Sequence, residues 1–407
     1  MSGGEMDGYR RRTRSLTGLV AAIILAVPVP LAGQQLGSIR GYSLTVPTAS
    51  GSGDLSDGGL ALLQQLRFMS RPTWGLVALE VAYQQNLQLR ENVAAGLSGT
   101  VFVPTSTKWL PLQWNIVDDD HVTWDHGFDR LALEAGGKDW DGTVGRQAIS
   151  WATTLFLTPA DPFAPFDPSD PFRVYRAGVD AARVRYYPGP LSEVDMVVRL
   201  ADTDSGTAVT ALARGRTTWG ETDVSAWAGL VFDHPGIAVG ATRSVGGLQL
   251  RGEISLRQDP DSGVAAVRLA VGVDNRFDVG GRDLYVVVEY QHDDFGASDA
   301  DDLTRVFRSE PFQDGEMQVL GEDEVAAQGS WQIHPLWNVS LLTLVNLRDG
   351  SGLVVPAGAY SVGTDITVGG GLFLSYGDGN IDLLSGTVGS EYGIVPMTGY
   401  LSVSWFF

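Results

Sequence analysis

The feature that most constrains this chain is a period-two alternation of apolar and polar residues, which recurs from about residue 174 to the C-terminus. The clearest block runs from Leu248 to Arg257. One face carries Leu248, Leu250, Ile254 and Leu256, and the other carries Gln249, Arg251, Glu253, Ser255 and Arg257. Successive side chains of a β-strand point to opposite faces, so each block predicts a strand with one apolar and one polar face.

Strand length separates a membrane barrel from a half-solvated soluble sheet. The blocks are roughly 10 to 13 residues long, which exceeds the usual globular strand and suits a tilted bilayer crossing. They follow one another as hairpins, and Tyr and Trp lie near their ends, where an aromatic girdle is expected. We count about 18 blocks and accept about 14 to 18, because strand boundaries are weakly determined by sequence. The fold class predicted is therefore all-β, an antiparallel transmembrane β-barrel with 18 strands as the best estimate.

Composition excludes several other classes. The chain has 28 Lys plus Arg against 48 Asp plus Glu, a formal charge of −20, and no Cys. Nucleic-acid binding needs a basic surface, so no nucleic-acid partner is expected. The absence of Cys excludes disulfides, thiolate metal sites and a lipid-anchoring cysteine. A mean hydropathy of +0.02 is too polar for a bundle of membrane-spanning helices.

The N-terminus predicts export. Arg10, Arg11, Arg12 and Arg14 precede an apolar stretch from Leu16 to Leu31, and the small residues Ala32 and Gly33 mark a cleavage zone. A membrane anchor is the alternative, but the apolar stretch is shorter than a bilayer requires and contains two prolines near its end. Residues 1–33 are predicted to be a signal peptide, and residues 34–407 the mature barrel.

The last strand carries the most specific signal. Leu401, Val403, Trp405 and Phe407 share one face, and the chain ends on Phe407. This resembles the C-terminal strand of Gram-negative outer-membrane proteins. The resemblance implies that these four residues are the assembly signal read by the barrel assembly machinery, in the cell outer membrane. A buried last strand of a soluble sheet is the alternative.

A second resemblance covers about 60 residues of the N-terminal half. The segments Val144-Gly145-Arg146-Gln147-Ala148-Ile149-Ser150-Trp151 and Thr158 to Pro168 resemble a group of bacterial porin-like barrels, which is distantly similar to alginate-export porins. The chain departs from that group at Ala152, Thr158 and Ala160. The resemblance implies a porin-like fold, but a fold alone does not identify a substrate.

Three connections stand out. The Pro/Asp-rich stretch 158–171 cannot form a regular ladder, and it should be a rigid loop. It either folds into the lumen as a constriction or plug, or serves as a stiff connector outside it. Two further segments, 91–128 and 292–321, are rich in Asp and are predicted to be acidic surface loops.

Charged residues on the polar faces are the candidate site. A charged side chain facing lipid costs about 2–4 kcal/mol at mid-bilayer, so these residues should face the lumen. The predicted pore-lining set is Arg183, Arg185, Asp195, Arg199, Arg251, Glu253, Arg257, Arg268 and Glu289. Such charges set ion preference in pores, or they merely neutralise one another across neighbouring strands.

Catalysis is not expected. The segment from Asp118 to Asp129 contains Asp118, Asp119, Asp120, His121, Asp125 and His126, but its spacing matches no metal or hydrolase template. No Gly-x-Ser-x-Gly elbow precedes a helix, and no cofactor is implied.

The function predicted is an outer-membrane channel for small polar or anionic solutes, with membrane lipid and the assembly machinery as partners. A structural or adhesive barrel whose acidic loops bind divalent cations or a partner is the alternative, and an embedded hydrolase ranks third. Homo-oligomerisation stays open.

Overall fold

A computed structural model describes residues 39–51, 58–91, 104, 106–163, 168–172, 174–382 and 387–407. The predicted signal peptide, residues 1–33, lies outside the described residues and stays a prediction. The same holds for residues 164–167 of the Pro/Asp-rich stretch.

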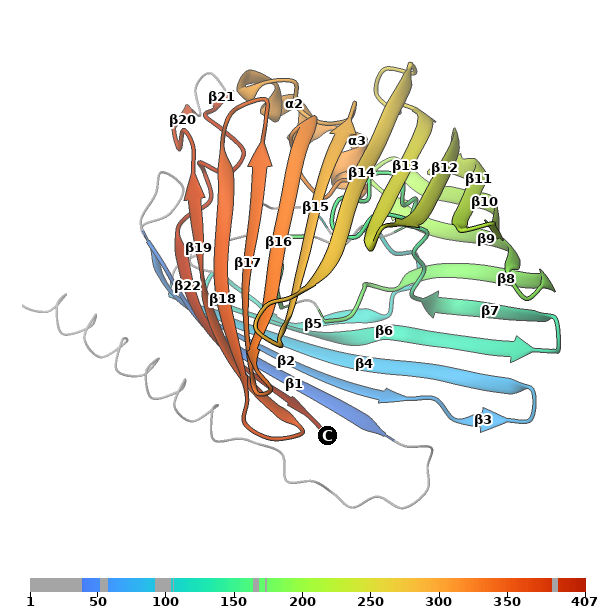
Figure 1. Ribbon diagram of the computed structural model, residues 1–407, viewed down its shortest axis with the longest axis horizontal. Coiled ribbons are helices and arrows are strands. Elements are labelled where there is room, and N and C mark those ends of the chain that lie inside the picture. Colours follow the sequence, from blue (N-terminus) through green and yellow to red (C-terminus); the bar gives the residue numbers. More distant parts are fainter. Residues whose placement is uncertain are drawn as a thin grey trace, which may run out of the picture.

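Eighteen antiparallel strands close into a barrel, as the alternation predicted (Figure 1). The wall strands in the first half of the chain are β1 Arg40–Ser50, β2 Gly59–Ser70, β4 Val77–Arg90, β6 Val122–Gly136, β7 Trp140–Gln147, β8 Val179–Gly189, β9 Ser192–Thr203 and β10 Gly206–Trp219. Those in the second half are β11 Thr222–Val231, β12 His234–Val245, β13 Leu248–Gln258, β14 Ala265–Asp278, β15 Asp283–Asp293, β16 Asp323–His334, β17 Trp337–Asn346, β18 Gly352–Ser361, β19 Ile366–Tyr376 and β22 Thr398–Phe406.

Shorter elements lie in the connections. They are β3 Thr73–Trp74, β5 Gln113–Asp118, η2 Ala300–Asp302, α2 Leu303–Arg308, α3 Glu310–Gln313, β20 Ile381–Asp382 and β21 Thr387–Val388. Within the part of the chain that the structure describes, no helix has the length and apolar character needed to cross a membrane.

The first and last strands form the closing seam. Tyr42 on β1 lies opposite Phe406 on β22, and the pairing runs on to Ser50 and Thr398. The Phe407 backbone N–H donates to the Gly41 carbonyl at 3.0 Å, and the Phe407 ring occupies the space that a Cβ on Gly41 would need. The C-terminal residue therefore completes the ladder of the closed barrel.

Burial alternates along the strands as the sequence pattern requires. On β13, Leu250, Ile254 and Leu256 are 40–45% exposed, whereas Glu253 and Arg257 are nearly buried. The apolar face points outward to lipid and the polar face inward, which avoids placing charge in the hydrocarbon region.

Long and short connections segregate to opposite ends. Two-residue turns such as Gly246–Gly247 lie at the end of the barrel that also holds the C-terminus, and α2, α3, β20 and β21 lie at the other end (Figure 1).

The first acidic connection is shorter than the predicted range 91–128, because β5 and the start of β6 occupy residues 113–118 and 122–128. The second spans 294–322 rather than 292–321, and it contains η2, α2 and α3.

The barrel interior is partly filled by the long connections. The β7–β8 connection packs Ile149, Trp151 and Phe163 against inward residues of β8–β12, including Trp227. The β15–β16 connection packs Phe295, Leu303 and Leu320 into a second apolar cluster with β16–β18. Both connections thus bring backbone polar groups inside the barrel, where they need partners.

Candidate functional site

The β7–β8 connection is held inside the barrel by glutamates of the wall. Glu289 on β15 is 1% exposed, and its carboxylate accepts the backbone N–H groups of Leu155, Phe156 and Leu157 at 2.7, 2.8 and 2.9 Å. Hydrogen bonds to a charged group contribute about 1.5–3 kcal/mol each. One side chain therefore satisfies three consecutive amides that have left the sheet.

A second glutamate binds both limbs of the same segment. Glu253 on β13 accepts the N–H of Thr153 at 2.6 Å and that of Thr154 at 3.3 Å through Oε2, and the N–H of Ala160 at 3.3 Å through Oε1. The two glutamates fix residues 153–160 against the β13–β15 side of the lumen. The Pro/Asp-rich stretch thus begins within a folded, inward segment.

The opposite side of this segment contacts the β8–β9 wall. Trp151 donates its indole N–H to Asp195 at 2.8 Å, and Asp195 also accepts from Arg183 at 2.6 Å. Arg199, fully buried, donates to the Phe163 carbonyl at 3.0 Å and to the Thr107 carbonyl at 3.0 Å. Arg199 therefore ties the β4–β5 connection to the β7–β8 connection.

The Gly-Arg-Gln segment at the end of β7 fixes the point at which the β7–β8 connection leaves the wall. Gly145 has φ +122°, and a Cβ there would lie 2.3 Å from the Leu131 carbonyl oxygen. Arg146 is 0% exposed and binds Asp180 through two bonds, Nε to Oδ1 at 2.7 Å and Nη2 to Oδ2 at 2.8 Å. Gln147 donates to the Ala181 carbonyl at 3.0 Å.

The β15–β16 connection meets the same segment inside the barrel. Gln318 accepts the Thr158 N–H at 2.5 Å and donates to the Phe156 carbonyl at 2.7 Å. Arg257 pairs with Glu316, and Arg268 pairs with Asp293 at 2.8 Å. Burial, together with Glu316 and Glu310, raises the pKa of Asp314 in this connection to about 7.

A cavity of about 330 Å³ lies between the β4–β5 and β7–β8 connections and the inner face of β1, β2, β4, β5 and β6. On its wall side, Gln65 donates to Asn86 at 3.1 Å, and Asn86 donates to Asp125 at 2.9 Å, in register across β2, β4 and β6. Lys108 and Tyr175 line it from the connections. Burial lowers the pKa of Lys108. Amide side chains, Lys108 and three carboxylates (Asp125, Asp129 and Asp170) in one cavity offer both donors and acceptors to a polar solute.

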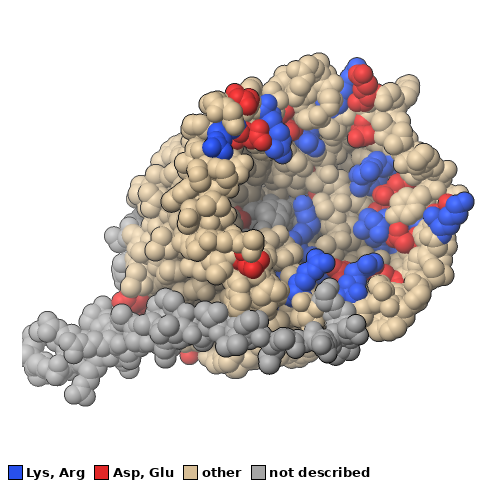
Figure 2. Space-filling view, turned by 60° about the horizontal axis from the view of Figure 1, so that its bottom comes forward, with Lys and Arg blue, Asp and Glu red and all other residues tan. Residues whose placement is uncertain are grey.

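Two arginines on the inner face of β10, Arg214 and Arg216, form no salt bridge among the described residues, although Glu193 lies opposite Arg216 in the ladder. Arg214 lies opposite Asp195 in the ladder, but Asp195 is engaged by Arg183 and Trp151. Arg214 instead stacks over the Trp151 ring at 5.6 Å, and Arg216 lies two residues further along the same face. Neither guanidinium has an ion-pair partner among the described residues. Figure 2 shows the hollow of the barrel from the end with the short turns, with basic and acidic side chains gathered on its wall.

The predicted pore-lining residues fall into two groups. Arg185 and Arg251 are partly exposed and pair with Asp141 and Asp274, each at 2.8 Å. The other seven are at most 15% exposed, and they hold inward segments or neighbouring strands; they are Arg183, Asp195, Arg199, Glu253, Arg257, Arg268 and Glu289. Their assignment as pore-lining stays a prediction. Sequence reasoning missed Arg214 and Arg216, which the alternation Leu212, Arg214, Arg216 places on one face.

The remaining candidate residues, in the acidic segment 118–129 and the C-terminal strand, do not lie together in one site. Asp125 and Asp129 line the cavity on the inner face of β6, whereas His126 bonds Tyr83 at 2.9 Å and stacks near Trp114. The acidic segment 118–129 is therefore not brought together as one site. Leu401 and Val403 are 64% and 45% exposed on the outer face of β22, and the rings of Trp405 and Phe407 lie 4.6 Å apart.

Comparison with known proteins identifies the fold. No protein-family model and no curated protein sequence matches the chain. The outer-membrane protein OpdK of Pseudomonas aeruginosa matches with a TM-score of 0.54 and 11% identity, over 91% of this chain and 98% of that chain. The chain shares the closed antiparallel β-barrel fold of this outer-membrane protein. OccAB4 of Acinetobacter baumannii gives a TM-score of 0.53 at 10% identity, over 93% and 100% of the two chains. A BenF-like porin of Pseudomonas fluorescens gives 0.50 at 12% identity, over 91% and 98%.

Proposed function

We propose that the chain is an outer-membrane channel that passes small polar or anionic solutes and catalyses no reaction. The observation that carries this proposal is the pair Arg214 and Arg216 on the inner face of β10, which forms no salt bridge among the described residues and has Glu193 and Asp195 as its nearest carboxylates across the ladder. Two neighbouring cationic side chains that face a lumen and lack a close salt bridge attract anions and raise their local concentration.

The two sides of the lumen differ in their polar side chains, which supports selective passage. The β8–β14 side carries ion pairs such as Arg183–Asp195 and Arg251–Asp274 together with Arg214 and Arg216, and the β2–β6 side carries the row Gln65, Asn86 and Asp125. A field across the lumen orients polar solutes as they pass the inward segments. The glutamate-anchored segment 153–160 would set the width of the passage.

Ion selectivity in a planar bilayer tests the proposal. We expect the wild-type barrel to show a reversal potential of anion-preferring sign in a KCl gradient, and the double variant Arg214→Ala/Arg216→Ala to shift it toward zero. Arg243→Ala is the matched control, because Arg243 is 57% exposed at a turn of β12 and pairs with Glu221. An equal shift in the control, or none in the double variant, would refute the role of the two arginines.

A closed structural or adhesive barrel is the second candidate. It is favoured by the extent to which segments 153–160 and 314–320 fill the interior. A correctly folded barrel that passes no current in the bilayer would support this candidate against the channel.

The C-terminal strand and the N-terminal motif extend the proposal. We propose that Leu401, Val403, Trp405 and Phe407 are recognised by the barrel assembly machinery, which their outward position at the seam would allow. The resemblance to the porin-like group is supported by the buried Arg146–Asp180 pair, which gives the Gly-Arg-Gln motif a structural role.

A further inference from the structure

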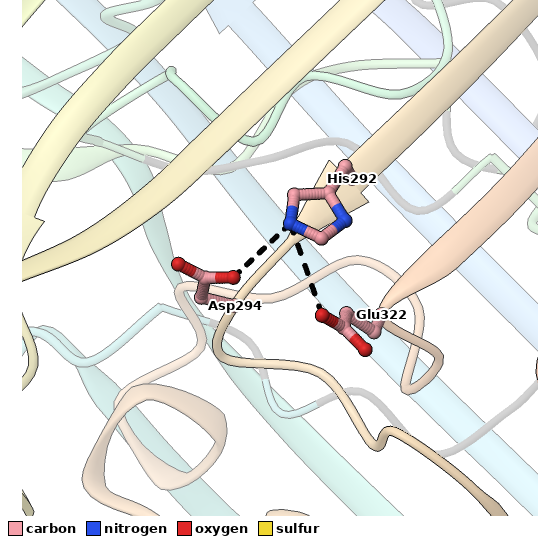
Figure 3. A group of neighbouring side chains, drawn as sticks. All are labelled: His292, Asp294 and Glu322. Carbon is pink, nitrogen blue, oxygen red and sulfur yellow. Dashed lines mark hydrogen bonds and ion pairs between the residues drawn. The ribbon is translucent and has the colours of Figure 1, made fainter.

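A mixed cluster of one histidine and two carboxylates lies where the β15–β16 connection leaves and re-enters the wall. His292 is near the end of β15, Asp294 opens the connection, and Glu322 closes it just before β16. Figure 3 shows the three side chains converging on one point from both ends of the connection. They are between 17% and 37% exposed, so an ion from solvent can reach them.

The donor atoms have the spacing of metal ligands. His292 Nε2 lies 3.1 Å from Asp294 Oδ1 and 3.8 Å from Glu322 Oε1, and all three atoms lie within 4.8 Å of one another. Zinc binds nitrogen and oxygen at about 2.0–2.2 Å in a tetrahedron, which places neighbouring ligand atoms about 3.3–3.6 Å apart. The two measured separations bracket that range.

The second atom of each donor is held by another group. His292 Nδ1 lies 3.0 Å from Asp323 Oδ1, Asp294 Oδ2 accepts the Val267 N–H at 2.7 Å, and Glu322 Oε2 pairs with Arg348 at 3.0 Å. Partners of this kind fix the orientation of metal ligands, and a carboxylate behind a histidine is the commonest of them. These partners hold the three side chains so that His292 Nε2, Asp294 Oδ1 and Glu322 Oε1 face one another.

The contacts of His292 Nδ1 determine which ring nitrogen is available to an ion. Asp323 also accepts from Tyr290 and pairs with Arg348, so it is an acceptor and His292 Nδ1 must donate to it. His292 Nε2, which faces two carboxylate oxygens, then either carries a proton that it donates to Asp294 or presents a lone pair to a bound cation. A metal ion or a proton between Nε2 and these oxygens removes their mutual repulsion, and the test below separates the two. The carboxylates of Asp294, Glu322 and Asp323 outnumber the nearby arginine, Arg348. The net negative charge suits a divalent cation.

We propose that His292, Asp294 and Glu322 form a binding site for one divalent transition-metal ion of the zinc class. An imidazole together with two carboxylates suits zinc better than calcium or magnesium, which prefer oxygen ligands alone. The bound ion would join the two ends of residues 294–322, the connection that places Gln318 and Glu316 inside the barrel. This site is separate from the channel, and it is tested without measuring current.

Titration calorimetry of the mature, untagged barrel with zinc chloride tests the site. The protein is stripped with EDTA, and its fold is verified by heat-modifiable gel migration. We expect one zinc per chain, and at least about a tenfold loss of affinity in His292→Ala and in Asp294→Asn, a loss of about 1.4 kcal/mol. Asp323→Asn, which alters only the group behind the histidine, should weaken zinc about tenfold. His334→Ala is the matched control, since His334 lies in the turn at the opposite end of the barrel.

Cobalt substitution gives an independent readout. Co²⁺ bound by a nitrogen and two oxygens should show the intense visible bands of four-coordinate cobalt, and His292→Ala should abolish them. Zinc binding that is unchanged in His292→Ala would overturn the proposal. Calcium or magnesium binding as tight as zinc binding would also overturn it. So would a folded barrel that shows no saturable zinc binding, which would mean that His292 Nε2 holds only a proton.

Discussion

Glu253 and Thr153 lie 100 positions apart in the sequence, yet Glu253 Oε2 accepts the Thr153 backbone N–H at 2.6 Å. This contact joins the barrel wall to a segment that has left the sheet. Together with Glu289 it converts the β7–β8 connection from a surface loop into a fixed constituent of the lumen. The width of the passage therefore depends on a few carboxylates rather than on the strand number alone.

Removal of the Glu289 carboxylate should loosen that segment. In Glu289→Ala the amides of Leu155, Phe156 and Leu157 lose their acceptor. We expect the segment to be destabilised by at least about 3 kcal/mol, with larger and noisier single-channel current and an intact barrel. Glu221→Ala is the control, because Glu221 is 79% exposed in a turn. Identical current in both variants would contradict the anchoring role.

The protonation of Asp314 should make the β15–β16 connection sensitive to pH. Its pKa is raised from 3.8 to about 7, chiefly by burial and then by Glu316 and Glu310; Arg199 and Asp204 also face it. The folded state holds this proton more tightly than the unfolded state, so stability falls as pH rises from about 4 to about 7 and levels off above. Hydrogen exchange across residues 314–322 should be faster at pH 8 than at pH 5.5, after correction for intrinsic rates.

The Asp314→Asn variant isolates this effect. Asparagine stays neutral, so the difference between the two pH values should shrink and protection at pH 8 should increase. Asp261→Asn, in the exposed β13–β14 turn, should keep the wild-type difference. An undiminished difference in Asp314→Asn would assign the pH dependence to another group.

Loss of the Arg146–Asp180 pair should cost much of the barrel's stability. Removing one partner of a buried ion pair costs about 3–5 kcal/mol, because the other charge stays buried. Arg146→Ala should lower the free energy of unfolding by that amount in urea titrations followed by tryptophan fluorescence. Arg146→Lys keeps the charge but not the two-bond geometry, so its free energy of unfolding should lie between those of the wild type and Arg146→Ala. Arg243→Ala should match wild type; an Arg146→Ala curve that overlays it would refute the prediction.

Phe407→Ala should reduce assembly in cells more than refolding in detergent. If the C-terminal strand is read by the assembly machinery, the variant should show less heat-modifiable barrel in the outer membrane, yet refold like wild type when purified. Phe277→Ala, an aromatic change on β14 at a side chain that is 45% exposed, is the control. Equal losses in cells for both variants would point to stability rather than recognition.

The strands were predictable because alternation is a local property. The blocks at Leu248 to Arg257 and at the C-terminus match β13 and β22 closely, since one face of each meets lipid. Within the segment Val144 to Trp151, strand β7 instead ends at Gln147. Its alternation continues to Ile149 and Trp151, but these side chains pack inside the barrel.

The inward contacts were not predictable, because they are long-range. Nothing near Glu289 in the sequence identifies Leu155 to Leu157 as its partners, which are more than 130 positions away. Arg214 and Arg216 were missed for a different reason. The outward residues between and beside them are Ala211, Ala213 and Gly215, whose small size hides the apolar face of β10.

Single-channel recording of the refolded mature chain, residues 34–407, in a planar bilayer tests the central claim most directly. We expect stable, stepwise currents that favour anions and that vanish when the barrel is heat-unfolded before addition. A barrel that is folded by gel migration and inserted in the bilayer, but passes no current over repeated insertions, would contradict it.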